Sequence, residues 1–394
     1  MVSVNLLIVT LGGGGAERVV AELYSSHPAD ILTRLAIFSS KINAYTVDSN
    51  NLTILSSEFC KTKLLKLIYS IRPRIIYCII RYTLYLRRNK ADVSVSFLTD
   101  MNITNIISCL LTHTKCLVSV RNNPNSDYSG IYGYILLNSS LFFTRFFADH
   151  VIVNSQGSRQ VLIQKYHINP DKVSVIYNPK DIQKIEKLKN EVVTESFFQT
   201  GEPVLMTAGR LFPQKGHVHL IRIFAELRKT YPCKLAICGV GPLEKQLKQL
   251  VHDLQIGGDV LFLGWCDNVY KYMAGSTVFV LPSLYEGQPN ALIEALICGC
   301  PIVSTDCDFG PREILEDGKY GILCKKLEGE MSNNFLTPLT PAEEDMYVKI
   351  KLLLDEPDLR KSFSDKSNER SLVFEKEKTI KEYYDIFKKV CNTE

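Results

Sequence analysis

Two glutamates eight positions apart are the residues in this sequence best suited to chemistry. In SLYEGQPNALIEALICGCPIVSTD (283–306) the pattern predicts a strand end, a loop at Glu286, and a helix capped by Asn290 that stops near Gly299. Glu294 then lies about one turn inside the helix. Both carboxylates can face a ligand at the helix N-terminus, where backbone N–H groups and the dipole favour a diphosphate. Taken alone, Glu294 is also compatible with a solvated helix residue.

A second cluster combines two cations with two glycines. In VLMTAGRLFPQKGH (204–217) an apolar strand runs into Gly209 and Arg210, and Lys215 and Gly216 follow within one short loop. At the carboxyl end of a parallel strand, these residues offer a diphosphate charge compensation and a closely approaching backbone. The loop is not a P-loop, because no glycine precedes Lys215 and no Ser or Thr follows it. A polar turn with surface charges is the alternative interpretation.

A third element is another strand, glycine turn and helix. It spans ICGVGPLEKQLKQLV (237–251), with Gly239 in the turn, and is followed by VLFLGWCDNV (260–269), which contains Cys266. Loops of this kind at strand ends commonly close over a base and ribose. The signal is weak when it stands alone.

The first predicted strand is followed by LGGGGAERVV (11–20), four glycines before a helix. Glu17 stands where the dinucleotide fingerprint needs its third glycine, and no acidic residue closes a second strand about 20 positions on. The sequence therefore argues against a nicotinamide cofactor. Gly13 and Gly14 more simply let a sugar or phosphate approach the backbone.

Two further groups of residues raise the question of a metal. Asp306 and Asp308 form a D-x-D pair of the kind that holds a metal in some sugar transferases. We expect no metal here, because the two cations of the second cluster already supply the positive charge. His217 and His219 are two apart in a predicted turn and are expected at the surface.

Chain length and pattern predict two domains. A chain of 394 residues is longer than one ordinary hydrophobic core can accommodate. Short apolar runs alternate with amphipathic stretches, as in βαβ units with parallel sheets. The predicted strands are 4–10, 34–38, 93–97, 116–120, 150–154, 203–208, 234–238, 259–263, 277–281 and 301–304. We expect an N-terminal domain over 1–178, a polar linker over 179–202, a C-terminal domain over 203–373, and a final helix (374–394) that packs back on the first domain.

Charge is unevenly placed along the chain. Residues 1–200 hold 22 Lys+Arg against 14 Asp+Glu (+8), and residues 201–394 hold 24 against 28 (−4). Nine basic residues and no acidic ones lie in 61–90, among many Leu, Ile and Tyr, which suits an anionic membrane surface. No leader sequence or spanning helix is predicted. We therefore expect a cytoplasmic protein peripherally bound to the inner face of the membrane, with no nucleic-acid partner.

Four motifs, GGGGAER, GRLFPQKGH, ICGVGP and EGQPNALIEALICGCPIV, in this order and at these separations, resemble the retaining glycosyltransferases of family four. The resemblance covers nearly the whole chain. It implies the α/β GT-B fold, in which two Rossmann-like, doubly wound parallel-sheet domains face a cleft. It also implies that Glu294 holds the donor's ribose, that Arg210 and Lys215 hold its diphosphate, and that Glu286 holds the transferring sugar, without a metal or other cofactor.

The full set of expected site residues follows from the motifs and the resemblance. Glu286, Arg210 and Lys215 are the expected catalytic residues. The donor is expected to contact Gly14, Gly209, Arg210, Lys215, Gly239, Cys266, Glu286, Gly287, Asn290 and Glu294. Gly13, Gly14, Arg121 and Asn122 are expected near the acceptor or the transferring sugar. Family members often carry a histidine where this chain has Arg121-Asn122, and SVRNNP is similar to the subgroup that builds bacterial surface polysaccharides on a polyprenyl diphosphate.

The function implied is transfer of a hexose or N-acetylhexosamine from a UDP-sugar to an undecaprenyl-diphosphate-linked saccharide, as in O-antigen or capsule synthesis. Two alternatives stay open. A nucleotide-sugar epimerase on the same fold would need no membrane face, which the basic 61–90 segment argues against. A non-catalytic nucleotide-sugar-binding protein would more readily have lost Glu286 or Lys215.

Overall fold

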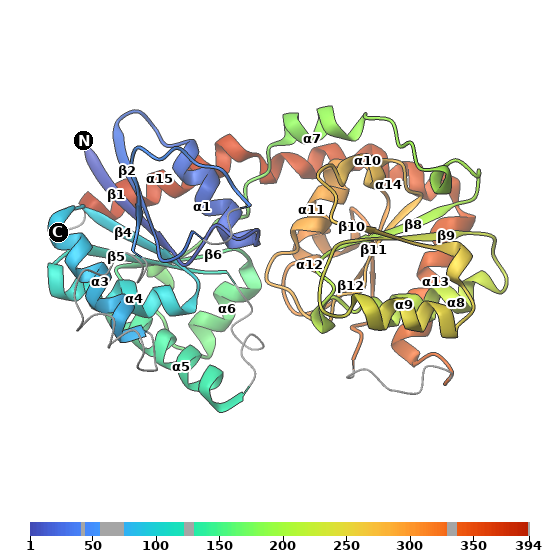
Figure 1. The fold of residues 1–394 in the computed structure, drawn as a ribbon, viewed down its shortest axis with the longest axis horizontal. Helices are drawn as coiled ribbons and strands as arrows, with labels where there is room; N and C mark the ends of the chain where they lie inside the picture. Colours follow the sequence, from blue (N-terminus) through green and yellow to red (C-terminus); the bar gives the residue numbers. More distant parts are fainter. Residues whose placement is uncertain (41–43, 56–74, 122–129, 329–336, 393–394) are drawn as a thin grey trace. The chain divides into compact units, whose positions relative to one another are not determined.

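The computed structural model describes residues 1–40, 44–55, 75–121, 130–328 and 337–392. The chain divides into two compact units. Unit 1 comprises Met1–Pro179 together with Lys376–Glu394, and unit 2 comprises Lys180–Glu375. Both units are parallel sheets flanked by helices (Figure 1).

Unit 1 contains a seven-stranded sheet in the order β3-β2-β1-β4-β5-β6-β7. Every pairing is parallel, and the order reverses between β1 and β4, as in a Rossmann fold. The strands are β1 (Val2–Ile8), β2 (Ile31–Ile37), β3 (Leu52–Ile54), β4 (Val93–Phe97), β5 (Lys115–Val120), β6 (His150–Val153) and β7 (Val173–Val175).

The central strands of unit 1 are buried on both faces because helices cover both. Along β1, Val4, Leu6 and Ile8 belong to one buried cluster and Leu7 to another, since successive side chains point to opposite faces. The helices of unit 1 are α1 (Gly15–Ser25), α3 (Ile75–Arg88), α4 (Thr99–Thr112), α5 (Gly130–Phe147), α6 (Gln156–Gln164) and α15 (Lys376–Asn392). The first cluster is closed by α1 and by α15, so the end of the chain completes the core of unit 1.

Unit 2 repeats this topology with six strands in the order β10-β9-β8-β11-β12-β13. They are β8 (Val204–Ala208), β9 (Lys234–Cys238), β10 (Val260–Gly264), β11 (Val278–Leu281), β12 (Ile302–Thr305) and β13 (Ile322–Cys324). The order reverses between β8 and β11. Ligands of doubly wound sheets bind outside the carboxyl ends of the strands at such a reversal.

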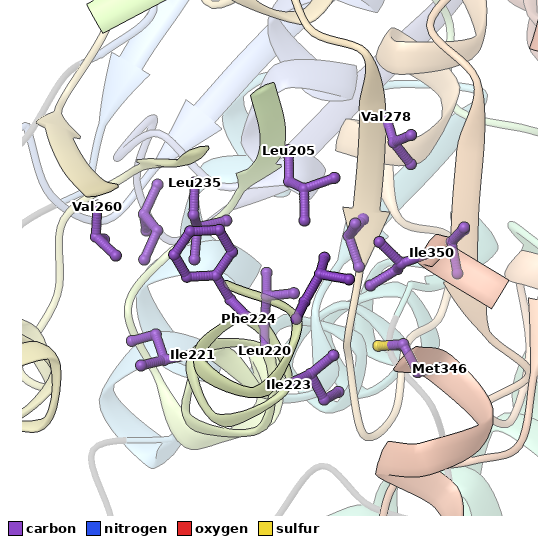
Figure 2. Packing of buried hydrophobic residues seen from close by; sticks show 14 of the residues in the cluster. Leu205, Leu220, Ile221, Ile223, Phe224, Leu235, Val260, Val278, Met346 and Ile350 are labelled. Atoms are coloured by element: carbon purple, nitrogen blue, oxygen red, sulfur yellow. The ribbon is translucent and has the colours of Figure 1, made fainter. Parts of the chain in front are cut away.

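The core of unit 2 lies largely between its sheet and α8 (His217–Arg228). Figure 2 shows Phe224 and Leu220 of α8 below Leu205 and Leu235 of the sheet. Met346, from α13 (Pro341–Asp355), extends the same cluster. The other helices of unit 2 are α7 (Ile182–Lys189), α9 (Glu244–Asp253), α10 (Tyr270–Ala274), α11 (Asn290–Ile297), α12 (Pro311–Ile314) and α14 (Pro357–Ser371). Burial of these apolar side chains, about 1.5–3 kcal/mol each, fixes the sheet that carries the loops described below.

Residues 180–202 differ from the linker suggested by their polarity. They belong to unit 2, where α7 packs against α10 and α11. Asp181 caps α7 by accepting a hydrogen bond from the Lys184 N–H, and Ile185 is buried. A short amphipathic helix with one apolar stripe looks polar in sequence, because most of its surface faces water.

None of the helices in the described ranges combines the length and apolar character that a membrane span requires. The predicted basic segment lies partly outside these ranges, since only its portion from residue 75 onward is described.

Candidate functional site

The loop that carries Arg210 and Lys215 follows β8, and the loop that carries Glu286 follows β11. These are the two strands that flank the reversal of strand order in unit 2. Lys215 of the β8 loop and Glu286 of the β11 loop form an ion pair, with Nζ and Oε1 2.5 Å apart. Both side chains are largely buried, at 18% and 6% exposed. These two residues are 71 positions apart in sequence, so their ion pair brings the two motifs together.

A short chain of hydroxyl groups holds Glu286 in position. The Ser283 hydroxyl donates to Glu286 Oε1 at 2.7 Å, and the Thr305 hydroxyl donates to the Ser283 carbonyl at 2.6 Å. Ser283 and Thr305 are completely buried. Sequence analysis did not single out either residue, because a serine and a threonine near strand ends carry no distinctive spacing.

Arg210 lies at the exposed side of the same loop. Its guanidinium sits over the Phe212 ring, 5.1 Å from the ring centroid. Gly209 lies between the strand and this loop, and a Cβ built there would touch the alkyl chain of Lys215 at 3.5 Å. The loop thus presents one partly buried and one exposed cation, an arrangement suited to a diphosphate.

Glu294 lies in α11 and is 10% exposed. Its Oε1 accepts a hydrogen bond from Lys180 Nζ at 2.7 Å, and the Lys180 side chain is fully buried. The predicted helix is present, but Asn290 is its first residue and not its cap, since Pro289 occupies the cap position. Proline is favourable there because the first N–H groups of a helix have no intrahelical partner.

Two glycines are required by the backbone of these loops. Gly216 has φ +63°, and a Cβ at this residue would overlap the Pro282 carbonyl. Gly239 has φ +141°, and a Cβ there would overlap the Gly209 carbonyl. Glycines therefore let the β8 loop pack directly against its two neighbouring strand ends, one of which carries Glu286. Gly287 follows Glu286, and its carbonyl lies close to Gly310.

Cys266 lies beside Cys238 at the carboxyl ends of β10 and β9. Both thiols reach the Gly264 carbonyl, at 3.9 and 3.7 Å. The hydrogen bond between the two thiols raises the pKa of Cys238 well above its usual range and lowers that of Cys266. The two thiols thus lie together at the carboxyl ends of the strands that precede the predicted base-binding loops.

The prediction that His217 and His219 lie at the surface in a turn is wrong. His217 begins α8 and is 2% exposed, and burial lowers its pKa to about 3, with Lys215 adding to the shift. His219 is partly buried, and its Nδ1 lies 2.9 Å from Glu343 Oε1. The two residues lie on a helix and not in a turn, so each faces neighbouring structure.

The D-x-D carboxylates are engaged in ion pairs with neighbouring cations. Asp306 pairs with Arg312, and Asp308 pairs with Lys326 at 2.8 Å. Across the described ranges, no group of three or more His, Cys, Asp and Glu side chains has an arrangement that could hold a metal.

Three of the residues expected near the acceptor lie in the described part of unit 1. Gly13 has φ +92°, and Gly14 precedes α1 as its cap residue. The Arg121 guanidinium is buried and donates to the Tyr383 hydroxyl of α15 and to Asn178 Oδ1. Asn122 lies outside the described residues.

This arrangement has a definite chemical capacity. Unit 2 offers two carboxylates, each oriented by a lysine, and an exposed arginine in the same loop as one of these lysines. Carboxylates accept hydrogen bonds from sugar hydroxyls, and cations bind phosphate oxygens. The site is therefore suited to a nucleotide diphosphate that carries a sugar.

Comparison with known protein families agrees with this chemistry. Residues 13–184 match "Glycosyltransferase Family 4", and residues 189–370 match "Glycosyl transferases group 1". With two Rossmann-like parallel-sheet units, the fold is of the GT-B class. The chain belongs to this glycosyltransferase family and is a glycosyltransferase.

Two relatives illustrate the similarity in sequence. An uncharacterized glycosyltransferase of Methanocaldococcus jannaschii is 34% identical over 76% of this chain and 79% of its own length. A Campylobacter jejuni enzyme, N-acetylgalactosamine-N,N'-diacetylbacillosaminyl-diphospho-undecaprenol 4-alpha-N-acetylgalactosaminyltransferase, is 29% identical over 97% of this chain and 98% of its own.

Solved structures share the fold at low sequence identity. Anabaena HepE in complex with UDP superimposes with a TM-score of 0.76, at 17% identity, over 99% of this chain and 100% of its own. A sucrose-phosphate synthase of Thermosynechococcus elongatus gives 0.75 at 15% identity, over 99% of both chains. These similarities establish the GT-B fold.

Proposed function

We propose that the enzyme transfers a hexose or N-acetylhexosamine from a UDP-sugar to a saccharide carried on undecaprenyl diphosphate, with retention of anomeric configuration. The observation that carries this proposal is the pair of lysine-held carboxylates, Glu286 and Glu294, beside Arg210. In this assignment Glu294 binds the ribose and Glu286 the transferring sugar. Lys215 and Arg210 bind the diphosphate.

Relatives support the choice of donor and acceptor. The Campylobacter enzyme is named for an undecaprenyl-diphosphate-linked acceptor, and it matches nearly the whole chain. An Escherichia coli relative, 26% identical over 67% of this chain and 70% of its own length, is named a UDP-Gal:alpha-D-GlcNAc-diphosphoundecaprenol alpha-1,3-galactosyltransferase. We assign the present enzyme to the same class of surface-polysaccharide synthesis.

In the mechanism that we propose, the diphosphate leaves the anomeric carbon on the face from which the acceptor arrives. The bond between that carbon and the diphosphate oxygen breaks while the acceptor hydroxyl forms a bond on the same face. The departing diphosphate takes the acceptor's proton, so no protein nucleophile is required. Glu286 stabilises positive charge on the sugar ring, and Lys215 and Arg210 stabilise negative charge on the diphosphate.

We propose that the reaction needs no metal. Lys215, 2.5 Å from Glu286, and the exposed Arg210 bring two positive charges to the place where a metal would otherwise neutralise the diphosphate. Activity should therefore be unchanged by EDTA. Loss of activity in chelator, with recovery on adding a divalent cation, would instead return Asp306 and Asp308 to the donor site.

We also propose that the enzyme binds the cytoplasmic face of an anionic membrane through 61–90 and through α5 of unit 1. In the described part, α3 ends in exposed Arg87 and Arg88. In α5, Phe142 and Phe146 are 58% and 53% exposed, and their rings pack 4.9 Å apart. Exposed aromatic and basic side chains together favour a lipid headgroup region.

The membrane proposal is tested with anionic and neutral liposomes. Serine replacement of both Phe142 and Phe146 should reduce binding to anionic liposomes several-fold, whereas Val348→Ser, at a 60%-exposed position of α13, should not. Wild-type protein that fails to bind anionic liposomes at low salt would contradict the proposal, because basic contacts are strongest there.

The transfer itself is tested by nucleotide release across a panel of sugar nucleotides, with a polyprenyl-diphosphate-linked saccharide as acceptor. We expect acceptor-dependent release of UDP from one UDP-hexose or UDP-N-acetylhexosamine. Release only from donors with another nucleotide would contradict the assigned donor. Transfer to free sugars alone would contradict the lipid-linked acceptor.

A further inference from the structure

Lys180 is a fully buried lysine that no motif identified. Its ammonium group donates to Glu294 Oε1 at 2.7 Å, and its side chain has no exposed surface. Burying an ammonium group costs several kcal/mol, and an apolar side chain of similar volume is often at least as stable in such a place. Stability alone therefore gives little reason for a lysine here.

The main chain of Lys180 joins the first residue of unit 2 to the last residues of the same unit. Lys180 is the first residue of that unit, and its N–H donates to the Phe374 carbonyl at 2.8 Å. Its backbone also forms an isolated parallel β-bridge with Glu375, the last residue of the unit. The two segments where the chain enters and leaves unit 2 are thus joined at the residue whose side chain reaches Glu294.

We infer that Lys180 is a positioning residue for donor binding, acting through Glu294. This inference rests on the proposed function, in which the Glu294 carboxylate accepts hydrogen bonds from the donor's ribose. A lysine on one carboxylate oxygen, 2.7 Å away, fixes the rotation of the Glu294 carboxylate. An oriented carboxylate is the acceptor that two neighbouring hydroxyls require.

The test is a double-mutant cycle on UDP affinity, measured by isothermal titration calorimetry. Lys180→Met and Glu294→Gln should each weaken UDP binding about tenfold, the scale of one lost charge-assisted hydrogen bond. The double variant should bind UDP no more weakly than the single variant with the lower affinity, because the two residues act through one contact. The kcat at saturating donor should change less than about threefold in Lys180→Met.

A second buried ion pair of unit 2 provides the matched control. Arg222 Nε lies 3.0 Å from Glu343 Oε1, between α8 and α13, with both side chains at most 8% exposed. Arg222→Met should lower the Tm and leave the Kd for UDP unchanged. A merely structural Lys180 would behave in the same way.

The outcomes separate the inference from the function on which it rests. UDP affinity at the wild-type level in folded Lys180→Met, with weaker binding in Glu294→Gln, would overturn the positioning role alone. Wild-type affinity in Glu294→Gln would overturn the ribose assignment itself. If Lys180→Met does not fold, Lys180→Leu, which also removes the hydrogen-bond donor, is judged by the same criterion.

Discussion

Unit 1 and unit 2 have the same strand order around their reversal point. They differ in the partners of the charged side chains that follow their strands. In unit 2, Glu286 and Glu294 each face a lysine. In unit 1, the guanidinium of Arg121 turns inward to a tyrosine hydroxyl and an amide oxygen. The two carboxylates of unit 2 are thus each oriented by an opposite charge, whereas Arg121 of unit 1 is packed among neutral groups.

The cause of this difference lies in how each unit closes its core. Helix α15, from the far end of the chain, covers one face of the unit 1 sheet and brings the Tyr383 hydroxyl to Arg121. In unit 2, the loops that carry the site pack through Gly216 and Gly239 and leave Arg210 exposed. The four predictions below test this comparison, from the largest expected effect to the smallest.

The largest effect is expected at Glu286. Glu286→Gln should lower kcat about a hundredfold to a thousandfold, because the carboxylate stabilises charge that develops only in the transition state. Glu294→Gln should instead raise the donor KM with little change in kcat. Steady-state kinetics with one donor and acceptor distinguish them, and Glu202→Gln, which alters a pair with Lys234 at the opposite end of the strands, is the control. Indistinguishable kinetics in the Glu286 and Glu294 variants would remove the division of roles.

Arg121 should matter for stability and not for donor binding. Arg121→Met leaves the Tyr383 hydroxyl and the Asn178 amide without this donor, which should cost about 2–4 kcal/mol of unfolding free energy. Denaturant unfolding measures the loss, and UDP titration should show an unchanged Kd. Weaker UDP binding without loss of stability would contradict this packing role of Arg121.

The two cations of the β8 loop should differ in importance. Lys215→Ala and Arg210→Ala should each reduce kcat/KM by about tenfold to a hundredfold, through lost charge-assisted contacts with the diphosphate. Lys215 should have the larger effect, since it is less exposed and also orients Glu286. Wild-type kinetics in either variant would show that its cation does not bind the donor.

A smaller effect concerns pH and the buried histidines. Burial lowers the pKa of His217 to about 3 and that of His150 in unit 1 to about 4, whereas the unfolded value is about 6.5. Below pH 6.5 the unfolded chain binds protons that the folded chain excludes, so stability falls as pH decreases from 6.5 toward these values.

For His217, the loss at pH 5 should be about 2 kcal/mol. The measurement is denaturant unfolding at pH 7.5 and 5.0 for the wild type and His217→Gln, with the variant showing the smaller pH dependence by that amount. Equal pH dependence in the two proteins would mean that His217 is protonated in the folded state.

Much of the fold was predictable from local pattern. Each of the ten predicted strands is present, because a parallel strand buried on both faces is a short apolar run. The strands that were missed are β3, β7 and β13, with three residues each, at the ends of their sheets. An edge strand of that length is too short to produce an apolar run.

The site was predictable only where its residues share a motif. The E-x7-E and GR-x4-K spacings placed Glu286, Glu294, Arg210 and Lys215 on the correct loops and helix. The partner of Glu294 lies 114 positions away, and the partner of Arg121 lies 262 positions away. Such pairings depend on how helices pack in three dimensions, which no local spacing encodes.

The claim that unit 2 binds the UDP portion of the donor through the loops after β8 and β11 is tested most directly by hydrogen–deuterium exchange with and without UDP. The account predicts slower exchange in residues 209–216 and 286–299 and unchanged exchange at 115–121, where Arg121 is buried. Protection confined to residues 115–121, with none in either loop of unit 2, would contradict it.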